Sequence, residues 1–132
     1  MTSAEIVYVV DDDESVRRAL SRLLRSAGLN VETFPSAQAF LSRELPDRTA
    51  CLVLDVRLPG LSGLDLQAAL KQAGRAMPIV FISGQSDVPV SVQAMKAGAA
   101  DFLSKPFDAD ELFRAIELAS GAAPERSSPP PR

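Results

Sequence analysis

Apolar and polar positions alternate along this chain in five successive units, each made of a short apolar run followed by a helical pattern. The runs predict strands because they concentrate Val, Ile, Leu and aromatic residues over a few positions. The first, third and fourth runs are nearly continuous, as in strands that helices cover on both faces. The predicted strands are Ile6 to Val10, Asn30 to Phe34, Cys51 to Leu54, Ile79 to Ile82 and Asp101 to Leu103.

Stripes of apolar residues at steps of three and four predict helices between these runs. Gly28 follows the first stripe where a left-handed C-terminal cap belongs. Ser36 is a candidate cap for a short second helix, and Asp108 with Glu111 has capping-box spacing before the last one. The stripes are Val16, Ala19, Leu20, Leu23, Leu24 and Ala27; Leu66, Ala69, Leu70 and Ala73; Val92 and Met95; and Leu112, Ala115, Ile116 and Ala119.

Five strand–helix repeats predict an α/β fold with a parallel sheet and right-handed crossovers. The chain has 132 residues, too few for an eightfold barrel. An open, doubly wound five-stranded parallel sheet over residues 1–120 is therefore the prediction. Residues 121–132 are rich in Pro and Ser, which predicts a linker or disordered tail.

Composition narrows the chemistry. The chain has 14 basic and 17 acidic residues, a net charge of −3 and no histidine. We expect no basic stripe that binds nucleic acid, and chemistry that depends on carboxylates, hydroxyls and lysines. Such groups suit Mg²⁺ better than zinc. With a single cysteine, Cys51, no membrane-length apolar run and no signal-peptide pattern, the cytoplasm is the expected location.

Polar residues stand at the ends of four predicted strands. Asp11 and Asp12 follow the first strand, Asp55 the third and Ser83 the fourth, while Lys105 lies just past the fifth. Open α/β sheets bind ligands beyond the carboxyl ends of their strands. These side chains are therefore expected at one edge of the sheet.

Three clustered carboxylates require a compensating charge, since two charges about 4 Å apart repel by roughly 4 kcal/mol at an effective dielectric of about 20. A divalent cation offsets that repulsion, and Lys105 and Ser83 suit the oxygens of a phosphoryl group. The central carboxylate can then act as a nucleophile and form an acyl phosphate. Taken singly, each residue also fits a turn, a helix cap or a solvated loop; their joint placement favours a site.

Four segments resemble the response regulator receiver family over about residues 5 to 120. They are Val9-Val10-Asp11-Asp12-Asp13, Leu54-Asp55-Val56-Arg57-Leu58-Pro59-Gly60 followed by Gly63, Ser83-Gly84, and Lys105-Pro106-Phe107. The run from Gly84-Gln85-Ser86-Asp87-Val88-Pro89 to Asp101-Phe102 resembles the FixJ-like subgroup. Members of that subgroup commonly carry a C-terminal DNA-binding domain, so DNA contact is expected only through an output domain absent from these residues.

The resemblance implies a flavodoxin-like (βα)5 sheet with strand order 2-1-3-4-5. It implies that Asp55 accepts a phosphoryl group from the phosphohistidine of a sensor histidine kinase. Mg²⁺, or Mn²⁺, would be held by Asp11, Asp12, Asp55 and the backbone carbonyl of Arg57. The domain would be a switch rather than an enzyme, although it would catalyse its own phosphorylation and dephosphorylation.

Further roles are implied by the same resemblance. Lys105 would hold the phosphoryl group, with a cis bond to Pro106, and Ser83 would be the switch hydroxyl, where many relatives have threonine. Phe102 would be the aromatic residue that turns inward on phosphorylation. Arg57 and Gln85 would tune the lifetime of the phosphorylated state.

The face that changes would consist of the fourth helix, fifth strand and fifth helix, where relatives commonly form homodimers. Phe113 and Leu118 fall off the core stripe of the last helix, which suits that surface.

Two other functions remain open. Asp11-Asp12-Asp13 also has the Asp-x-Asp spacing of haloacid-dehalogenase-type phosphatases, in which Asp11 would be the nucleophile. Against this, the late acidic pair of that family is not evident after Lys105. The second alternative is a receiver-like module that dimerises without phosphorylation, although such modules usually lack site residues. A flavodoxin-type FMN binder is excluded because no hydroxyl-rich loop follows the first strand.

Overall fold

The computed structural model describes residues 6–43, 49–75, 77–84 and 88–120 of the chain. Strands and helices alternate there in the predicted order. The elements are β1 (Ile6–Val10), α1 (Glu14–Ser26), β2 (Asn30–Phe34), α2 (Ala37–Leu41), β3 (Thr49–Asp55), α3 (Gly63–Gln72), β4 (Ile79–Ser83), α4 (Val88–Lys96), β5 (Asp101–Ser104) and α5 (Ala109–Ala119). β1 and β2 have the predicted bounds, and the other strands extend slightly beyond their apolar runs. The predicted tail lies outside the described residues.

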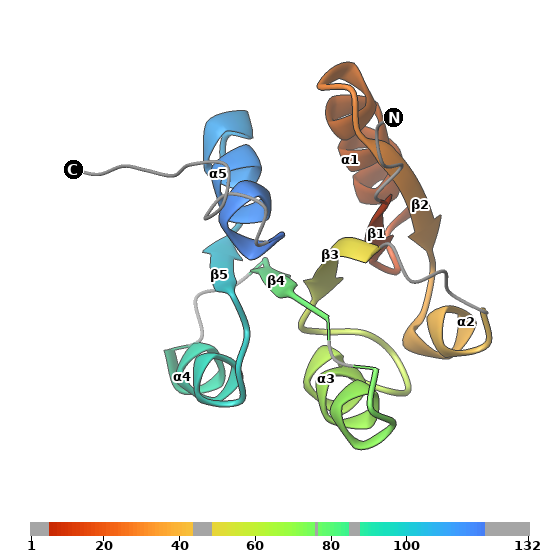
Figure 1. The fold of residues 1–132 in the computed structure, drawn as a ribbon, viewed down its shortest axis with the longest axis vertical. Coiled ribbons are helices and arrows are strands. Elements are labelled where there is room, and N and C mark those ends of the chain that lie inside the picture. The colour runs from red at the N-terminus through yellow and green to blue at the C-terminus, as the bar shows by residue number, and fades with distance from the viewer. Residues whose placement is uncertain (1–5, 44–48, 76, 85–87, 121–132) are drawn as a thin grey trace.

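The strands form one parallel sheet in the order β2-β1-β3-β4-β5. β1 lies between β2 and β3, with Val9 opposite Thr33 on one side and Val53 on the other. Helices α1 and α5 cover one face of the sheet, and α2, α3 and α4 cover the other (Figure 1). The predicted doubly wound, flavodoxin-like fold is confirmed.

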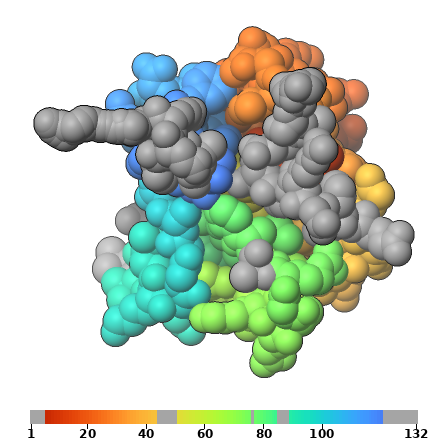
Figure 2. Space-filling model, in the orientation of Figure 1, coloured from red at the N-terminus to blue at the C-terminus, as the bar shows by residue number. Residues whose placement is uncertain are grey.

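Two apolar layers fill the space between the sheet and its helices. Successive strand residues enter opposite layers, which is why the strand sequences are apolar without interruption. The layer under α1 and α5 includes Val7, Val9, Leu20, Leu24, Cys51, Val53, Val80, Ile82, Leu112 and Ile116. The layer under α2, α3 and α4 includes Tyr8, Val10, Phe34, Phe40, Leu52, Leu54, Leu66, Leu70, Phe81 and Ala94. In the space-filling view, the teal residues of α4 and β5 lie directly against the green residues of α3 and β4 (Figure 2).

Cys51 lies fully buried in the layer under α1 and α5. Burial raises the pKa of its thiol to about 12. The thiol is therefore protonated at neutral pH and packs as a small apolar side chain, as the sequence predicts.

Side-chain caps set the starts of the helices. Ser36 accepts a hydrogen bond from the Ala39 N–H at 3.0 Å, which confirms the predicted cap of α2. The Asp108 carboxylate accepts one from the Glu111 N–H at 2.8 Å, and the Asp108 N–H donates one to the Glu111 carboxylate, so the predicted capping box of α5 is present. At the other end of a helix, Gly28 has a φ of 86°, the left-handed conformation expected after α1.

Some positions depart from the predicted stripes. Ala19 and Ala27 are exposed, because the buried stripe of α1 is narrower than the sequence suggests and centres on Leu20 and Leu24. Phe113 is partly buried against the layer under α1 and α5, whereas the side chain of Leu118 is 64% exposed. Of the two residues expected on the outer face of α5, Leu118 alone lies fully on it. Across the described ranges, no helix combines the length and apolarity that crossing a membrane requires.

Replacing Asp108 with alanine removes the cap of α5 and leaves the Glu111 N–H without its side-chain acceptor. We expect Asp108→Ala to lower the free energy of unfolding by about 1 kcal/mol in urea denaturation. Asp110→Ala is the matched control: it removes an exposed first-turn carboxylate that does not cap the helix. Equal losses in the two variants would contradict a specific capping role for Asp108.

Candidate functional site

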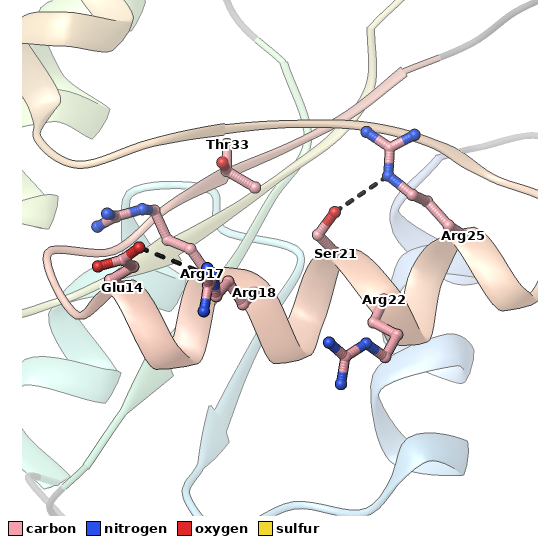
Figure 3. A pocket seen from close by; sticks show the side chains of 7 residues that line it. All are labelled: Glu14, Arg17, Arg18, Ser21, Arg22, Arg25 and Thr33. Atoms are coloured by element: carbon pink, nitrogen blue, oxygen red, sulfur yellow. Dashed lines mark hydrogen bonds and ion pairs between the residues drawn. The ribbon is translucent and has the colours of Figure 1, made fainter.

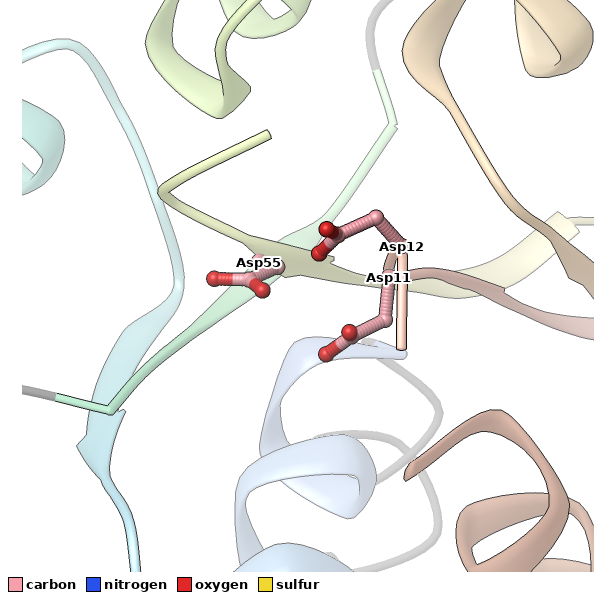
Figure 4. Close-up of side chains that lie close together, drawn as sticks. All are labelled: Asp11, Asp12 and Asp55. Atoms are coloured by element: carbon pink, nitrogen blue, oxygen red, sulfur yellow. The ribbon is translucent and has the colours of Figure 1, made fainter. Parts of the chain in front are cut away.

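The carboxyl ends of the parallel strands bring the predicted site residues to one edge of the sheet, here called the carboxyl edge. Asp11 follows β1, Asp55 ends β3 and Ser83 ends β4. Carboxylate oxygens of Asp11, Asp12 and Asp55 all lie within 4.8 Å of one another. In the close-up, these side chains face a common space (Figure 4). The predicted convergence of the three carboxylates is therefore present in the fold.

Three consecutive aspartates have three different environments. Asp11 is fully buried, Asp12 is exposed, and Asp13 turns away to cap α1. The Asp13 carboxylate accepts hydrogen bonds from the Ser15 hydroxyl at 2.7 Å and the Ser15 N–H at 2.9 Å, and these bonds lower its pKa. Asp13 thus caps a helix, which is the structural role that the sequence alone allowed for each of the three aspartates.

Partners on several segments hold Asp11. Its carboxylate accepts a hydrogen bond from the Asp13 N–H at 2.9 Å and forms an ion pair with Lys105 Nζ at 3.3 Å. Its carbonyl oxygen accepts from Arg17 Nη1 at 2.8 Å, and its own N–H donates to the Phe34 carbonyl at 3.1 Å. A buried carboxylate requires such partners, and here they also fix its orientation.

Asp55 is 7% exposed, at the end of β3. Burial raises the pKa of its carboxyl group to about 6, and the Asp11 carboxylate acts in the same direction. The Arg57 N–H, which donates to Asp55 at 3.1 Å, and the charge of Lys105 oppose that rise. The rise in pKa therefore reflects mainly the burial of this carboxylate, which the Lys105 charge and the Arg57 hydrogen bond do not offset.

The start of α3 packs directly on the backbone of Asp55. A methyl group on Gly63 would lie 2.4 Å from the Asp55 carbonyl oxygen and 3.0 Å from the Val56 Cα. The Gly63 N–H also donates to the Val56 carbonyl at 3.0 Å. Only glycine permits this approach, so Gly63 helps to position Asp55.

Ser83 and Lys105 are joined through the backbone. The Lys105 N–H donates to the Ser83 carbonyl at 2.7 Å, which ties the end of β4 to the residue that follows β5. Ser83 is 1% exposed, and the Lys105–Pro106 peptide bond is cis, as the resemblance implies. Phe102 on β5 is opposite Phe81 on β4, and their ring centroids are 6.1 Å apart.

Arg57 and Gln85 complete the predicted set of site residues. The Arg57 side chain is exposed beside the site, while its N–H bonds Asp55. Gln85, expected to tune the lifetime of a phosphorylated state, lies outside the described residues.

The donor set fits a hard divalent cation. Asp11, Asp12 and Asp55 offer carboxylate oxygens, which Mg²⁺ prefers, and the chain has no histidine to favour a softer metal. Lys105 contributes one positive charge, against three carboxylates. A bound cation would reduce the remaining repulsion, and these three aspartates are the residues that would hold it.

Two features near the site were not predicted from the sequence. One is the contact of Gly63 with Asp55, which the spacing alone does not reveal. The other is a row of arginines on α1, namely Arg17, Arg18, Arg22 and Arg25. Their helical spacing is visible in the sequence, and it departs from the expectation that the chain has no basic stripe.

Comparisons with known proteins agree on one family. A family model described as the response regulator receiver domain matches residues 7–117. The response regulator protein TodT of Pseudomonas putida is 50% identical over 98% of this chain and 57% of its own length. Nodulation protein W of Bradyrhizobium diazoefficiens is 56% identical over 87% of this chain and 51% of its own. The chain thus spans little more than half the length of these curated relatives.

Solved structures give the same result. The crystal structure of FixJ-N is 41% identical, with a TM-score of 0.84, over 92% of this chain and 96% of that one. The structure of the response regulator StyR is 50% identical, with a TM-score of 0.85, over 94% of this chain and 63% of that one.

The raised pKa of Asp55 predicts a pH-dependent stability. In the unfolded chain this carboxyl ionises near its ordinary pKa of 3.8, and in the fold only near 6. The contribution of Asp55 to the free energy of unfolding therefore falls as pH rises from about 4 to 6 and then levels off. In metal-free buffer, Asp55→Asn should be more stable than the wild type by about 1 to 2 kcal/mol at pH 7.5.

Urea denaturation at several pH values measures this difference. The advantage of Asp55→Asn should shrink as the pH falls from 6 to 4, because the wild-type carboxyl becomes neutral. Asp110→Asn is the control, since Asp110 is an exposed carboxylate on α5 and is not one of the clustered aspartates. If the difference in free energy of unfolding stayed constant between pH 4 and 6, ionisation of Asp55 would not be its cause.

A methyl group at Gly63 must displace either α3 or the backbone of Asp55. We expect Gly63→Ala to lower the free energy of unfolding by about 1 to 3 kcal/mol, the usual cost of overpacking. Gly84→Ala is the matched control, because no atom of the described residues lies within 4 Å of a methyl group there. If both variants unfold at the same urea concentration as the wild type, the close contact does not constrain the fold.

Proposed function

We propose that Asp55 of this chain, which belongs to the response regulator receiver domain family, accepts a phosphoryl group in a reaction that requires Mg²⁺. One observation carries the proposal: the Asp55 carboxylate is clustered with those of Asp11 and Asp12 at the carboxyl edge, and Lys105 is paired to the same cluster. The chain is a signalling domain rather than a classical enzyme.

The transfer is a displacement at phosphorus. An oxygen of the ionised Asp55 carboxylate forms a bond to phosphorus, while the bond from phosphorus to the donor's imidazole nitrogen breaks and the imidazole leaves with that electron pair. Mg²⁺, when bound, offsets the negative charge of the carboxylates and of the phosphoryl oxygens. A cation beside Asp55 also favours its ionised form, which is the nucleophile.

The neighbouring residues bind the transferred group and the cation. Lys105 exchanges its ion pair with Asp11 for a phosphoryl oxygen, and the Ser83 hydroxyl donates to another. Asp11 and Asp12, with Asp55 and the carbonyl of Arg57, would hold the cation. Mn²⁺, which also prefers oxygen ligands, is an alternative metal.

Phosphorylation adds a charge of about −1.5 to −2 next to Ser83 and Lys105. Movement of Ser83 toward that charge opens space for the partly buried Phe102, which biases a two-state equilibrium. The change reaches the face formed by α4, β5 and α5. Val92, Met95 and Leu118 are exposed there by 46%, 43% and 64%, which suits a phosphorylation-dependent homodimer.

The wider role rests on the relatives. The phosphoryl donor in this proposal is a sensor histidine kinase, and the output is transcription, through a DNA-binding domain that is not among these residues. Names such as transcriptional regulatory protein FixJ support this role, and those relatives are longer than the present chain. Arg57 and Gln85 adjust the rate at which the domain removes its own phosphoryl group.

The phosphatase alternative, with Asp11 as the nucleophile, fits less well. Asp11 is fully buried, and its carboxylate is already bonded to the Asp13 N–H and Lys105. Asp13, the second acid of that motif, caps α1. Neither residue is placed as that reaction requires.

Intact-mass spectrometry after incubation with acetyl phosphate tests the proposal. We expect one phosphoryl adduct on the wild type with Mg²⁺, and less than about a tenth of it in EDTA. Asp55→Asn should give no adduct, because an amide cannot form the acyl phosphate.

Asp13→Asn is the matched control, since it makes the same change two residues from the cluster's Asp11 and should retain the adduct. An adduct that persists in Asp55→Asn would identify another nucleophile and favour the phosphatase mechanism. If the folded wild type accepts no phosphoryl group from acetyl phosphate or phosphoramidate, the phosphorylation-independent interaction module is the better account.

A further inference from the structure

Helix α1 carries an unusual concentration of positive charge. It holds four of the chain's 14 basic residues and one of its 17 acidic residues, in a protein with a net charge of −3. Its four arginines are Arg17, which is partly buried, and Arg18, Arg22 and Arg25, which are exposed. We refer to this set as the arginine face.

The stability of the helix does not explain this arrangement. Arg18 and Arg22 are four residues apart, a spacing at which like charges destabilise a helix. Arg17 and Arg18 lie near the N-terminal end, where the helix dipole disfavours cations. Among the described residues, the acidic partner of these arginines is Glu14, whose carboxylate is 3.7 Å from Arg18, and both of these side chains are more than 70% exposed.

The arginine face borders an open groove of about 550 Å³ between α1 and the edge strand β2. Thr33 projects from β2 toward α1, between Arg17 and Arg25 (Figure 3). Ser21 lines the groove from the helix side. The lining therefore combines guanidinium groups with two hydroxyls from different elements.

Hydrogen bonds to the protein hold two of the guanidinium groups in place. Arg17 Nη1 donates to the Asp11 carbonyl at 2.8 Å. Arg25 Nη2 donates to the Val31 carbonyl at 2.8 Å, and its Nε donates to the Ser21 hydroxyl at 3.1 Å. These bonds restrain the two ends of the groove and leave other guanidinium N–H groups for a ligand, which lowers the entropy cost of binding.

We propose that this groove binds a short chain of phosphate groups, as in an oligophosphate or the triphosphate of a nucleotide. Arginine forks match the paired oxygens of phosphates, and hydroxyls donate to the remaining ones. Arg17 and Arg25 are eight residues apart, which corresponds to about 12 Å along a helix. A chain of several phosphates can therefore contact both ends of the groove, as a single phosphate cannot.

This site is separate from the carboxylate cluster. The cluster repels anions unless a cation is bound, whereas the arginine face attracts them without a metal. The proposal does not depend on phosphorylation of Asp55. Binding can therefore be measured in EDTA, which also keeps Mg²⁺ from complexing the phosphate chain.

Isothermal titration calorimetry of the full 132-residue chain with sodium tripolyphosphate, in EDTA at constant ionic strength, tests the proposal. We expect saturable binding of one ligand per chain, weakened about tenfold or more in an Arg22→Gln, Arg25→Gln double variant. Thr33→Val should weaken it about threefold, because the β2 hydroxyl contributes one hydrogen bond.

Arg114→Gln is the matched control: Arg114 is an exposed arginine on α5, far from the groove in sequence, and its loss should leave the affinity unchanged. Thermal melting of each variant checks that the fold is intact. Equal affinities for ATP and tripolyphosphate would identify the phosphate chain as the ligand, and tighter binding of ATP would identify a nucleotide; both support the site.

Two outcomes would overturn the proposal. Equal weakening by Arg114→Gln would show a response to overall charge instead of to the groove. A chain that binds a poly-glutamate peptide but no tripolyphosphate would show that the arginine face recognises an acidic polypeptide.

Discussion

Repulsion among carboxylates at the carboxyl edge is the constraint on which the rest of this structure depends. A parallel sheet brings the ends of β1 and β3 to one edge, so Asp11 and Asp55 must lie close together with little water around them. Lys105, which follows β5 at the same carboxyl edge, supplies one compensating positive charge. The uncompensated negative charge of these carboxylates lowers the stability of the fold. The same negative charge makes the site responsive to cations and phosphoryl groups.

The sequence was sufficient to predict the sheet and the set of residues that meet at its carboxyl edge. Strand ends in a parallel sheet share an edge whatever their separation along the chain, so locating the ends of the apolar runs located Asp11, Asp55 and Ser83. The environments of individual side chains were not predictable in this way. Asp11, Asp12 and Asp13 are residues of the same type. The local direction of the backbone decides which of them is buried, which is exposed and which caps a helix.

The hydrophobic pattern also does not predict contacts that depend on the path by which a connecting segment returns to the sheet. Gly63 meets Asp55 because the segment after β3 folds back over its own strand end, which hydrophobic periodicity does not encode. Arg17 reaches the Asp11 carbonyl for a similar reason, through the turn between β1 and α1. That bond makes the arginine face and the carboxylate cluster neighbours, so charges of opposite sign border one another on a small surface.

The placement of β5 has a mechanical consequence. β5 is an edge strand whose sole neighbour among the described strands is β4, and its residues are partly buried or exposed where those of β4 are all buried. The helices on either side of it belong to different layers, α4 to one and α5 to the other. Because fewer buried contacts hold it, β5 can shift with α4 and α5 at a lower cost than the central strands can.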